Sequence, residues 1–123
     1  MTPVHLKEIL AKDNRYSASA YQFVLFSLQC LVSSFKEPRH VTGQELCLSI
    51  KETAFGAFGP LARMVFNEWG LRKTQDFGNV VYNMIEVGAM GRQPADNLSD
   101  FDDVFDFCEL DDYEIVIPKE KKK

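Results

Sequence analysis

The chain has 123 residues, of which 46% are hydrophobic, 26% charged and 12% aromatic, and its formal net charge is −4. This balance is typical of one globular domain with its own core, and it excludes a chain that is disordered throughout. The three cysteines are an odd number and lie far from any metal-knuckle spacing, so neither a disulfide framework nor a structural metal is expected.

The most apolar stretch covers residues 18–32 and is interrupted by Gln22, Ser27 and Gln29. A membrane-spanning helix needs about twenty apolar residues, so this stretch is interpreted as a buried helix. The first ten residues lack the apolar run and the small-residue cleavage site of a signal peptide. We therefore expect a cytoplasmic protein that does not bind a membrane.

Helical signals begin at the start of the chain. Residues 3–11 are expected to form a short amphipathic helix with proline at its first position. A longer helix is expected over 19–35, behind a capping box formed by Ser19 and Gln22. Its apolar side chains surround most of the circumference, so we expect this helix to be the centre of the fold.

A second capping box, Thr42 and Glu45, predicts the next helix over residues 42–58. Gly59 and Pro60 follow directly, and they are expected to end this helix and to open another one.

Two further helices are expected over residues 60–69 and 74–85. Gly70 is expected to end the first in a left-handed conformation, and Thr74 to be the N-cap of the second, with Asp76 in its first turn. The side chains expected to point inward from the first are Leu61, Met64, Val65 and Trp69.

Charge changes sharply after the last expected helix. Residues 1–93 carry a net charge of +2, residues 94–117 one of −9 and residues 118–123 one of +3. We therefore divide the chain into a helical body over 1–98, an acidic-aromatic segment over 99–117 that belongs to the same domain, and a disordered basic tail over the last six residues.

Aromatic side chains alternate with carboxylates in the acidic-aromatic segment. Alternation predicts short extended structure, a hairpin with its turn at 110–112. Because an exposed apolar strand would aggregate, its aromatic residues are expected either to pack on the body or to form an interface with a partner. The candidate interface residues are Phe101, Phe105, Phe107 and Tyr113. Some of the arginines of the body are expected to lie beneath the acids; they are Arg15, Arg39, Arg63, Arg72 and Arg92.

These signals together predict a mainly α fold. It is a compact five-helix domain with an acidic C-terminal segment that contains a short extended or hairpin element.

No catalytic, cofactor-binding or metal-binding residues are predicted. The chain has no phosphate-binding loop and no nucleophile elbow. Cys30 and Cys47 lie in apolar helical surroundings, where a thiol is usually inert. A small thiol- or histidine-dependent enzyme that uses Cys108 or His40 stays open as an alternative.

The expected helices over 60–69 and 74–85 also fit the geometry of a helix-turn-helix. The second of them contains no Lys or Arg, and the chain has no basic surplus. Both observations disfavour nucleic acid as a partner, and a helix-turn-helix-like protein is kept as a second alternative.

Several stretches of the chain form a distinctive pattern: RHVTGQEL at 39–46, FGPLA at 58–62, NEWG at 67–70 and TQDFGNVV at 74–81. This pattern resembles a family of short, uncharacterised conserved proteins of planctomycetes and verrucomicrobia. The resemblance implies a self-contained unit of about this length in a bacterial cytoplasm. It implies no activity, cofactor or substrate.

Five polar residues of the pattern and its flanks have no expected role in the core and are named as a candidate functional surface: Arg15, Arg39, His40, Arg72 and Asp76. Capping and surface ion pairs are the alternative role for them. Because no catalytic constellation is found, we predict a non-enzymatic protein-interaction module without a cofactor. Its predicted partner is a protein, and a homo-oligomer is left open.

Overall fold

The computed structural model describes residues 3–37, 41–88 and 98–112, and it is mainly helical. The α-helices are α1 (Pro3–Lys12), α2 (Ala18–Ser33), α3 (Gly43–Phe58), α4 (Ala62–Glu68) and α5 (Thr74–Glu86). Short 3-10 helices are η1 (Gly59–Leu61), η2 (Leu98–Phe101) and η3 (Phe107–Asp112). No strand occurs within the described ranges. The expected mainly α class is confirmed.

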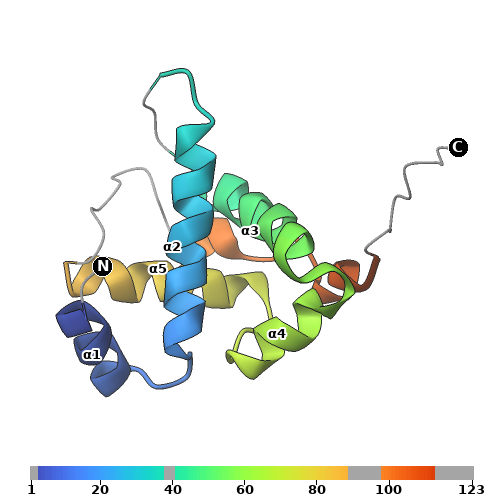
Figure 1. Cartoon of the computed structure of the whole chain (residues 1–123). Helices are drawn as coiled ribbons and strands as arrows, with labels where there is room; N and C mark the ends of the chain where they lie inside the picture. The colour runs from blue at the N-terminus through green and yellow to red at the C-terminus, as the bar shows by residue number, and fades with distance from the viewer. Residues whose placement is uncertain (1–2, 38–40, 89–97, 113–123) are drawn as a thin grey trace, which may run out of the picture.

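The α5 helix lies at the centre of the molecule. It packs against α1, α2, α3 and η2, and Figure 1 shows α2 standing across it on the outside. Buried residues of α5 are Thr74, Asp76, Phe77, Gly78, Val80, Val81 and Met84, whereas those of α2 are only Ala20, Tyr21, Val24 and Ser27. The expectation that the 19–35 helix is central is wrong, because among the described residues α2 has neighbours on its inner side alone.

One of the two expected capping boxes is present. The Thr42 N–H donates to Glu45 Oε1 and the Glu45 N–H donates to Thr42 Oγ1, each at 3.1 Å. The α2 helix begins earlier than expected, with Ser17 rather than Ser19 as its N-cap. A tertiary contact holds this position, since the Ser17 N–H donates to the Trp69 carbonyl at 3.1 Å.

The end of α4 is tied to the loop before α2. Gly70 has a φ of +91°, which confirms the expected left-handed conformation. A Cβ atom at this position would lie 2.1 Å from the Arg15 carbonyl oxygen, so only glycine fits. The Leu71 N–H closes the turn by donating to the Phe66 carbonyl at 2.8 Å.

The expected 60–69 helix is divided in two. Its first residues form η1, and the α-helical part has only seven residues. Ala62 and Phe66, one turn apart, are the buried residues of α4. The expectation that Leu61 and Met64 point inward is wrong. Leu61 belongs to the exposed 3-10 turn, and Met64 follows the buried Ala62 by two residues and so lies on the opposite side of α4.

Candidate interaction surface

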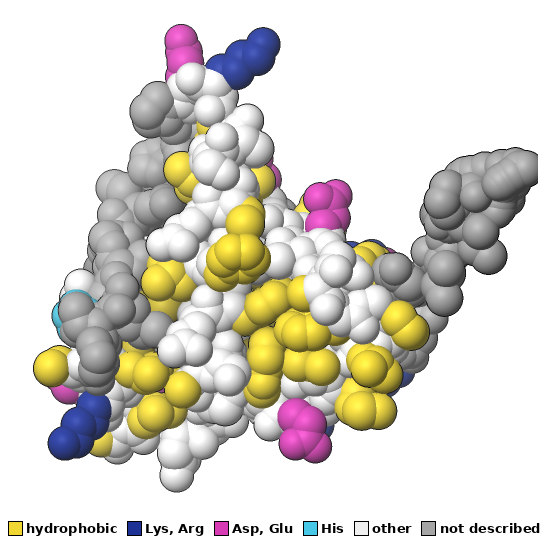
Figure 2. Space-filling model, viewed as in Figure 1, with side chains coloured by type: hydrophobic (Ala, Val, Ile, Leu, Met, Phe, Trp, Pro, Cys, Tyr) yellow, Lys and Arg dark blue, Asp and Glu magenta, His cyan; other side chains and the backbone are white. Residues whose placement is uncertain are grey.

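An apolar surface lies where α2, α3 and α4 meet, and Figure 2 shows hydrophobic side chains gathered on α2 and between α2 and α4. Phe23 of α2, Phe58 of α3 and Trp69 after α4 form a cluster of three rings, with centroids 5.3 to 5.6 Å apart. All three are half-buried. The buried ring of Phe66 lies beneath Phe23 and Trp69, at 5.8 and 6.0 Å, and joins the cluster to the core.

Further exposed apolar side chains lie on α2, on α4 and on the 3-10 helix η1 that joins α3 to α4. Phe26 of α2 is 53% exposed, Leu61 of η1 54% and Met64 of α4 62%. Phe26 follows Phe23 by three residues, so the two lie on neighbouring positions of one helix face. We call these residues the apolar face: Phe23, Phe26, Phe58, Leu61, Met64 and Trp69.

The sequence contained one signal for this surface. The sixteen residues of α2 include no Asp, Glu, Lys or Arg. A helix without a charged face is normally buried on all sides, and the inner side of α2 alone is covered by the described residues. Leu61 and Met64 could not be found in this way, because neither belongs to α2.

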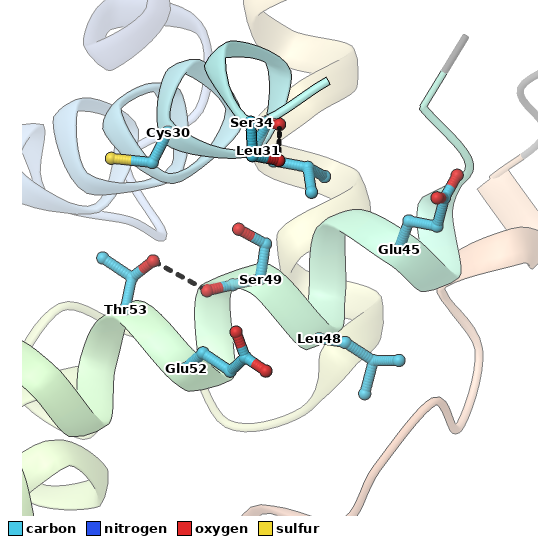
Figure 3. Close-up of a pocket in the computed structure, with 8 residues that line it drawn as sticks. All are labelled: Cys30, Leu31, Ser34, Glu45, Leu48, Ser49, Glu52 and Thr53. Atoms are coloured by element: carbon cyan, nitrogen blue, oxygen red, sulfur yellow. Dashed lines mark hydrogen bonds between the residues drawn. The ribbon is translucent and has the colours of Figure 1, made fainter. Parts of the chain in front are cut away.

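A groove of about 380 Å³ separates the ends of α2 and α3. Figure 3 shows Cys30 on α2 and Ser34, the C-cap of α2, across from Ser49 and Thr53 on α3. The Thr53 hydroxyl donates to the Ser49 carbonyl at 2.7 Å, and the Ser49 hydroxyl to the Ser27 carbonyl at 3.2 Å. The hydroxyl groups of Ser49 and Thr53 are thus already bonded to the backbone, and they do not converge on a ligand as in a small-molecule site.

Two cysteines of the chain differ from each other in exposure. Cys47 is buried, as expected, and burial raises the pKa of its thiol to about 12. Cys30 is exposed at the rim of the groove. The expectation of an apolar environment for Cys30 is wrong, because Cys30 lies on the side of α2 that the described residues leave exposed.

The polar residues predicted as a functional surface meet in part at the N-terminal end of α5. The buried carboxylate of Asp76 accepts hydrogen bonds from the backbone N–H groups of Arg72 at 2.8 Å and Lys73 at 3.2 Å. It also accepts one from the Tyr16 hydroxyl at 2.6 Å, and the Tyr16 oxygen accepts one from Asn79 Nδ2 at 3.0 Å. Burial, followed by the hydrogen bond to Asp76, raises the pKa of Tyr16 to about 12. Asp76 thus caps α5 and holds the loop before α2.

A second group of contacts joins the same loop to the middle of α5. Asn83 Nδ2 donates to Asp13 Oδ2 at 2.9 Å and to the Tyr21 hydroxyl at 3.1 Å. Arg15 Nη2 donates to Asp13 Oδ2 at 2.8 Å. This hydrogen bond is the main reason that the pKa of Asp13 lies far below its usual range.

The described members of the predicted surface therefore have structural contacts. Arg15 is exposed and paired with Asp13, and Arg72 is exposed while its backbone N–H bonds to Asp76. Arg39 and His40 lie outside the described residues. A functional role for this set stays a prediction.

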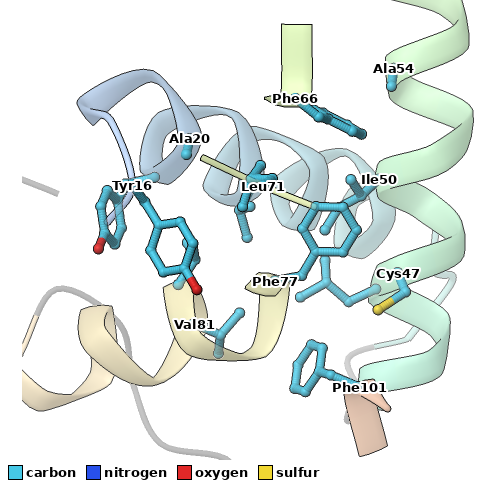
Figure 4. Packing of buried hydrophobic residues seen from close by; sticks show 14 of the residues in the cluster. Tyr16, Ala20, Cys47, Ile50, Ala54, Phe66, Leu71, Phe77, Val81 and Phe101 are labelled. Carbon is cyan, nitrogen blue, oxygen red and sulfur yellow. The ribbon is translucent and has the colours of Figure 1, made fainter. Parts of the chain in front are cut away.

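Three of the candidate interface residues of the acidic-aromatic segment, Phe101, Phe105 and Phe107, lie in the core, where Figure 4 shows Phe101 together with Phe77 and Cys47. The Phe107 ring lies 5.6 Å from Phe77 and 5.7 Å from Phe105, which is also buried. Because the folded chain covers Phe101, Phe105 and Phe107 itself, they are not available to a partner. Tyr113 lies outside the described residues.

Thr74 attaches this segment to α5. Its buried hydroxyl donates to the Phe101 carbonyl at 2.6 Å and accepts from the Val104 N–H at 3.2 Å. The expectation that Thr74 is the N-cap is wrong, since the N-cap of α5 is Lys73. Threonine at a helix start is typical of a cap, so the sequence contained no signal for this long-range contact.

A lysine of α3 pairs with the segment. Lys51 Nζ lies 2.9 Å from Glu109 Oε1 and 5.2 Å from the centre of the Phe105 ring. Among the expected arginines, Arg63 lies near Asp106, where its charge helps to lower the pKa of that carboxyl after the larger effect of the Cys108 N–H hydrogen bond.

The predicted hairpin falls only partly within the described residues. Its turn was expected at 110–112, and these residues belong to η3. Its second arm and the basic tail lie beyond residue 112, so the hairpin and the tail stay predictions.

Comparison of the chain with protein-family models, curated proteins and solved structures finds no match. The described helices include none that is long and apolar enough to cross a membrane. Within residues 3–37, 41–88 and 98–112, no group of three or more His, Cys, Asp and Glu side chains could hold a metal ion. Function therefore has to be inferred from the surface of the molecule.

Proposed function

We propose that the protein is a non-enzymatic protein-interaction module that binds a protein partner through the apolar face. The observation that supports this proposal is the exposure of Phe26, Leu61 and Met64 around a three-ring cluster. Single exposed apolar side chains are ordinary, whereas a group of them around aromatic rings is typical of an interaction site. Tryptophan is among the residues that contribute most to binding at interfaces, and Trp69 belongs to the cluster.

The two alternatives receive less support. A nucleic-acid reader would present Asn79 and Asn83 from α5, and both amides are bound to tyrosine hydroxyls within the molecule. A thiolate enzyme needs an accessible thiol of low pKa, and Cys47 is buried with a pKa raised to about 12 by burial. The Cys108 or His40 enzyme and membership of the family that the chain resembles stay predictions.

A photo-crosslinking amino acid tests the proposed function in the cells that produce the protein. It replaces Phe26 in one variant and Gln44 in a control variant. Gln44 is also exposed, but it lies at the opposite end of α3 from Phe58, about 21 Å along the helix.

We expect a crosslinked protein of defined mass from position 26, none from position 44, and loss of the product when Met64→Glu is added. Met64 is exposed, so this substitution leaves the fold intact. Equal products from both positions, or no product from position 26, would contradict the proposal.

A further inference from the structure

We infer that the partner of the apolar face is a basic segment of another protein, in which Lys or Arg side chains flank apolar ones. This inference rests on the proposed function and names the chemistry of the partner. It is carried by the charges beside the apolar face and by the groove between α2 and α3 that continues this face.

Acidic side chains lie on two sides of the apolar face. Glu68 follows Met64 by four residues, so the two lie on the same side of α4. Glu52 of α3 lines the groove, which reaches α2 at Cys30, one helical turn after Phe26. Figure 2 shows acidic side chains above and below the hydrophobic area between α2 and α4. A partner that covers the apolar face therefore meets negative charge on either side of it.

These two carboxylates are not neutralised within the described part of the chain. Glu52 and Glu68 are exposed, and neither forms an ion pair with another described residue. The basic residues of α3 and α4, Lys51 and Arg63, instead approach acids of the acidic-aromatic segment. The charge beside the apolar face is therefore negative, which attracts a basic partner and repels an acidic one, such as a nucleic acid.

The groove suits the long side chain of a lysine or an arginine. Its lining includes Leu31 of α2 and, one helical turn apart on α3, Leu48 and Glu52, as Figure 3 shows, and it contains no Lys or Arg. Glu45 also lines the groove, where its carboxylate caps α3 by accepting from the Thr42 N–H. The stem of a Lys or Arg side chain packs on apolar surface while its charged end stays in water. A basic residue of the partner thus lays its stem on Leu31 and Leu48 and brings its charge to Glu52.

Selection from a library of random peptides displayed on phage tests this chemistry on the full chain. The library is selected on the native protein and on the double variant Glu52→Lys, Glu68→Lys. The matched control Glu8→Lys, Asp102→Lys makes the same change in net charge at exposed positions outside the apolar face and the groove. We expect peptides rich in Lys or Arg and apolar residues from the native protein and the control, and acidic apolar peptides from the double variant.

The affinity of one selected basic peptide gives the size of the effect. Fluorescence anisotropy of the labelled peptide should show about three- to tenfold weaker binding to Glu68→Lys than to the native protein, because an exposed ion pair becomes a repulsion. Binding to Glu8→Lys should stay unchanged. Added salt should weaken binding to the native protein, since it screens exposed charges. Circular dichroism verifies that each variant is folded.

Uncharged or acidic peptides from the native protein, or basic peptides retained by the double variant, would overturn the inference. Met64→Gln tests the proposed function separately, because it removes an apolar contact of the face without adding charge. If the selected peptides show no preference for basic residues and Met64→Gln weakens their binding, the proposed function survives without the basic partner. If no peptide is selected, or Met64→Gln weakens none of them, both proposals fail.

Discussion

The α5 and α2 helices differ in how completely their apolar side chains are buried. In α5 the apolar residues lie inside, and the polar Asp76, Asn79 and Asn83 are bonded to residues of the loop before α2 and to Tyr21 of α2 itself. In α2 the inner side chains are buried, whereas Phe26 and Cys30 face solvent with no charged residue beside them on the helix. Within the described parts of the chain, the apolar side of α5 is therefore covered, whereas the outer side of α2 is exposed.

This difference separates residues that stabilise the fold from residues that are free to bind. Substitutions in α5 should change the free energy of unfolding of the monomer, because its side chains contact the whole core. Substitutions on the outer side of α2 should leave it almost unchanged and affect only association.

The largest effect is expected from Phe77→Ala. The Phe77 ring packs on Phe66, Phe105 and Phe107 and is fully buried, so its loss should lower the free energy of unfolding by about 3–5 kcal/mol. The matched substitution Phe26→Ala should change it by less than about 0.5 kcal/mol in dilute solution. Urea unfolding followed by circular dichroism measures both. Similar losses for the two variants would show that α2 is as buried as α5.

A smaller effect is expected where α5 holds the acidic-aromatic segment. Thr74→Val leaves the Val104 N–H and the Phe101 carbonyl without the Thr74 hydroxyl, which should cost about 1–3 kcal/mol. The control is Thr53→Val, because the Thr53 hydroxyl bonds only to a carbonyl of its own helix. Its cost in the same urea experiment should stay below about 0.5 kcal/mol. Equal costs would mean that the Thr74 contact does not stabilise the fold.

The smallest effect concerns pH. The pKa of Tyr16 is raised from 10.0 to about 12, so the unfolded chain ionises first as the pH rises. The stabilisation is complete below pH 10 and is lost as the pH approaches 12, where the ionised Tyr16 would also face the Asp76 carboxylate. The measured free energy of unfolding should decrease between pH 10 and pH 12. In the Tyr16→Phe variant this decrease should be smaller. The same slope in the native protein and in Tyr16→Phe would refute a role for Tyr16.

Much of the local structure could be predicted from the sequence. The Thr42 and Glu45 capping box, the left-handed Gly70 and the break at Gly59 depend on neighbours within a few residues, and all three are present. The periodicity of α5 also predicted its buried face, because its apolar and polar residues occupy opposite sides. The start of α2 could not be predicted in this way, since the Trp69 carbonyl holds Ser17.

The sequence by itself determined that this chain is mainly helical, where most of its helices begin and end, and that α2 carries apolar side chains without charge. Only the tertiary structure decided which sides those helices present. Leu61 and Met64 lie on the exposed sides of η1 and α4. The hydroxyl of Thr74 binds Phe101 and Val104, which follow it by 27 and 30 residues. Both outcomes depend on the position of distant backbone, which local propensity does not encode. For the same reason the apolar face depends on how α2, α3 and α4 pack against one another, which the sequence does not show.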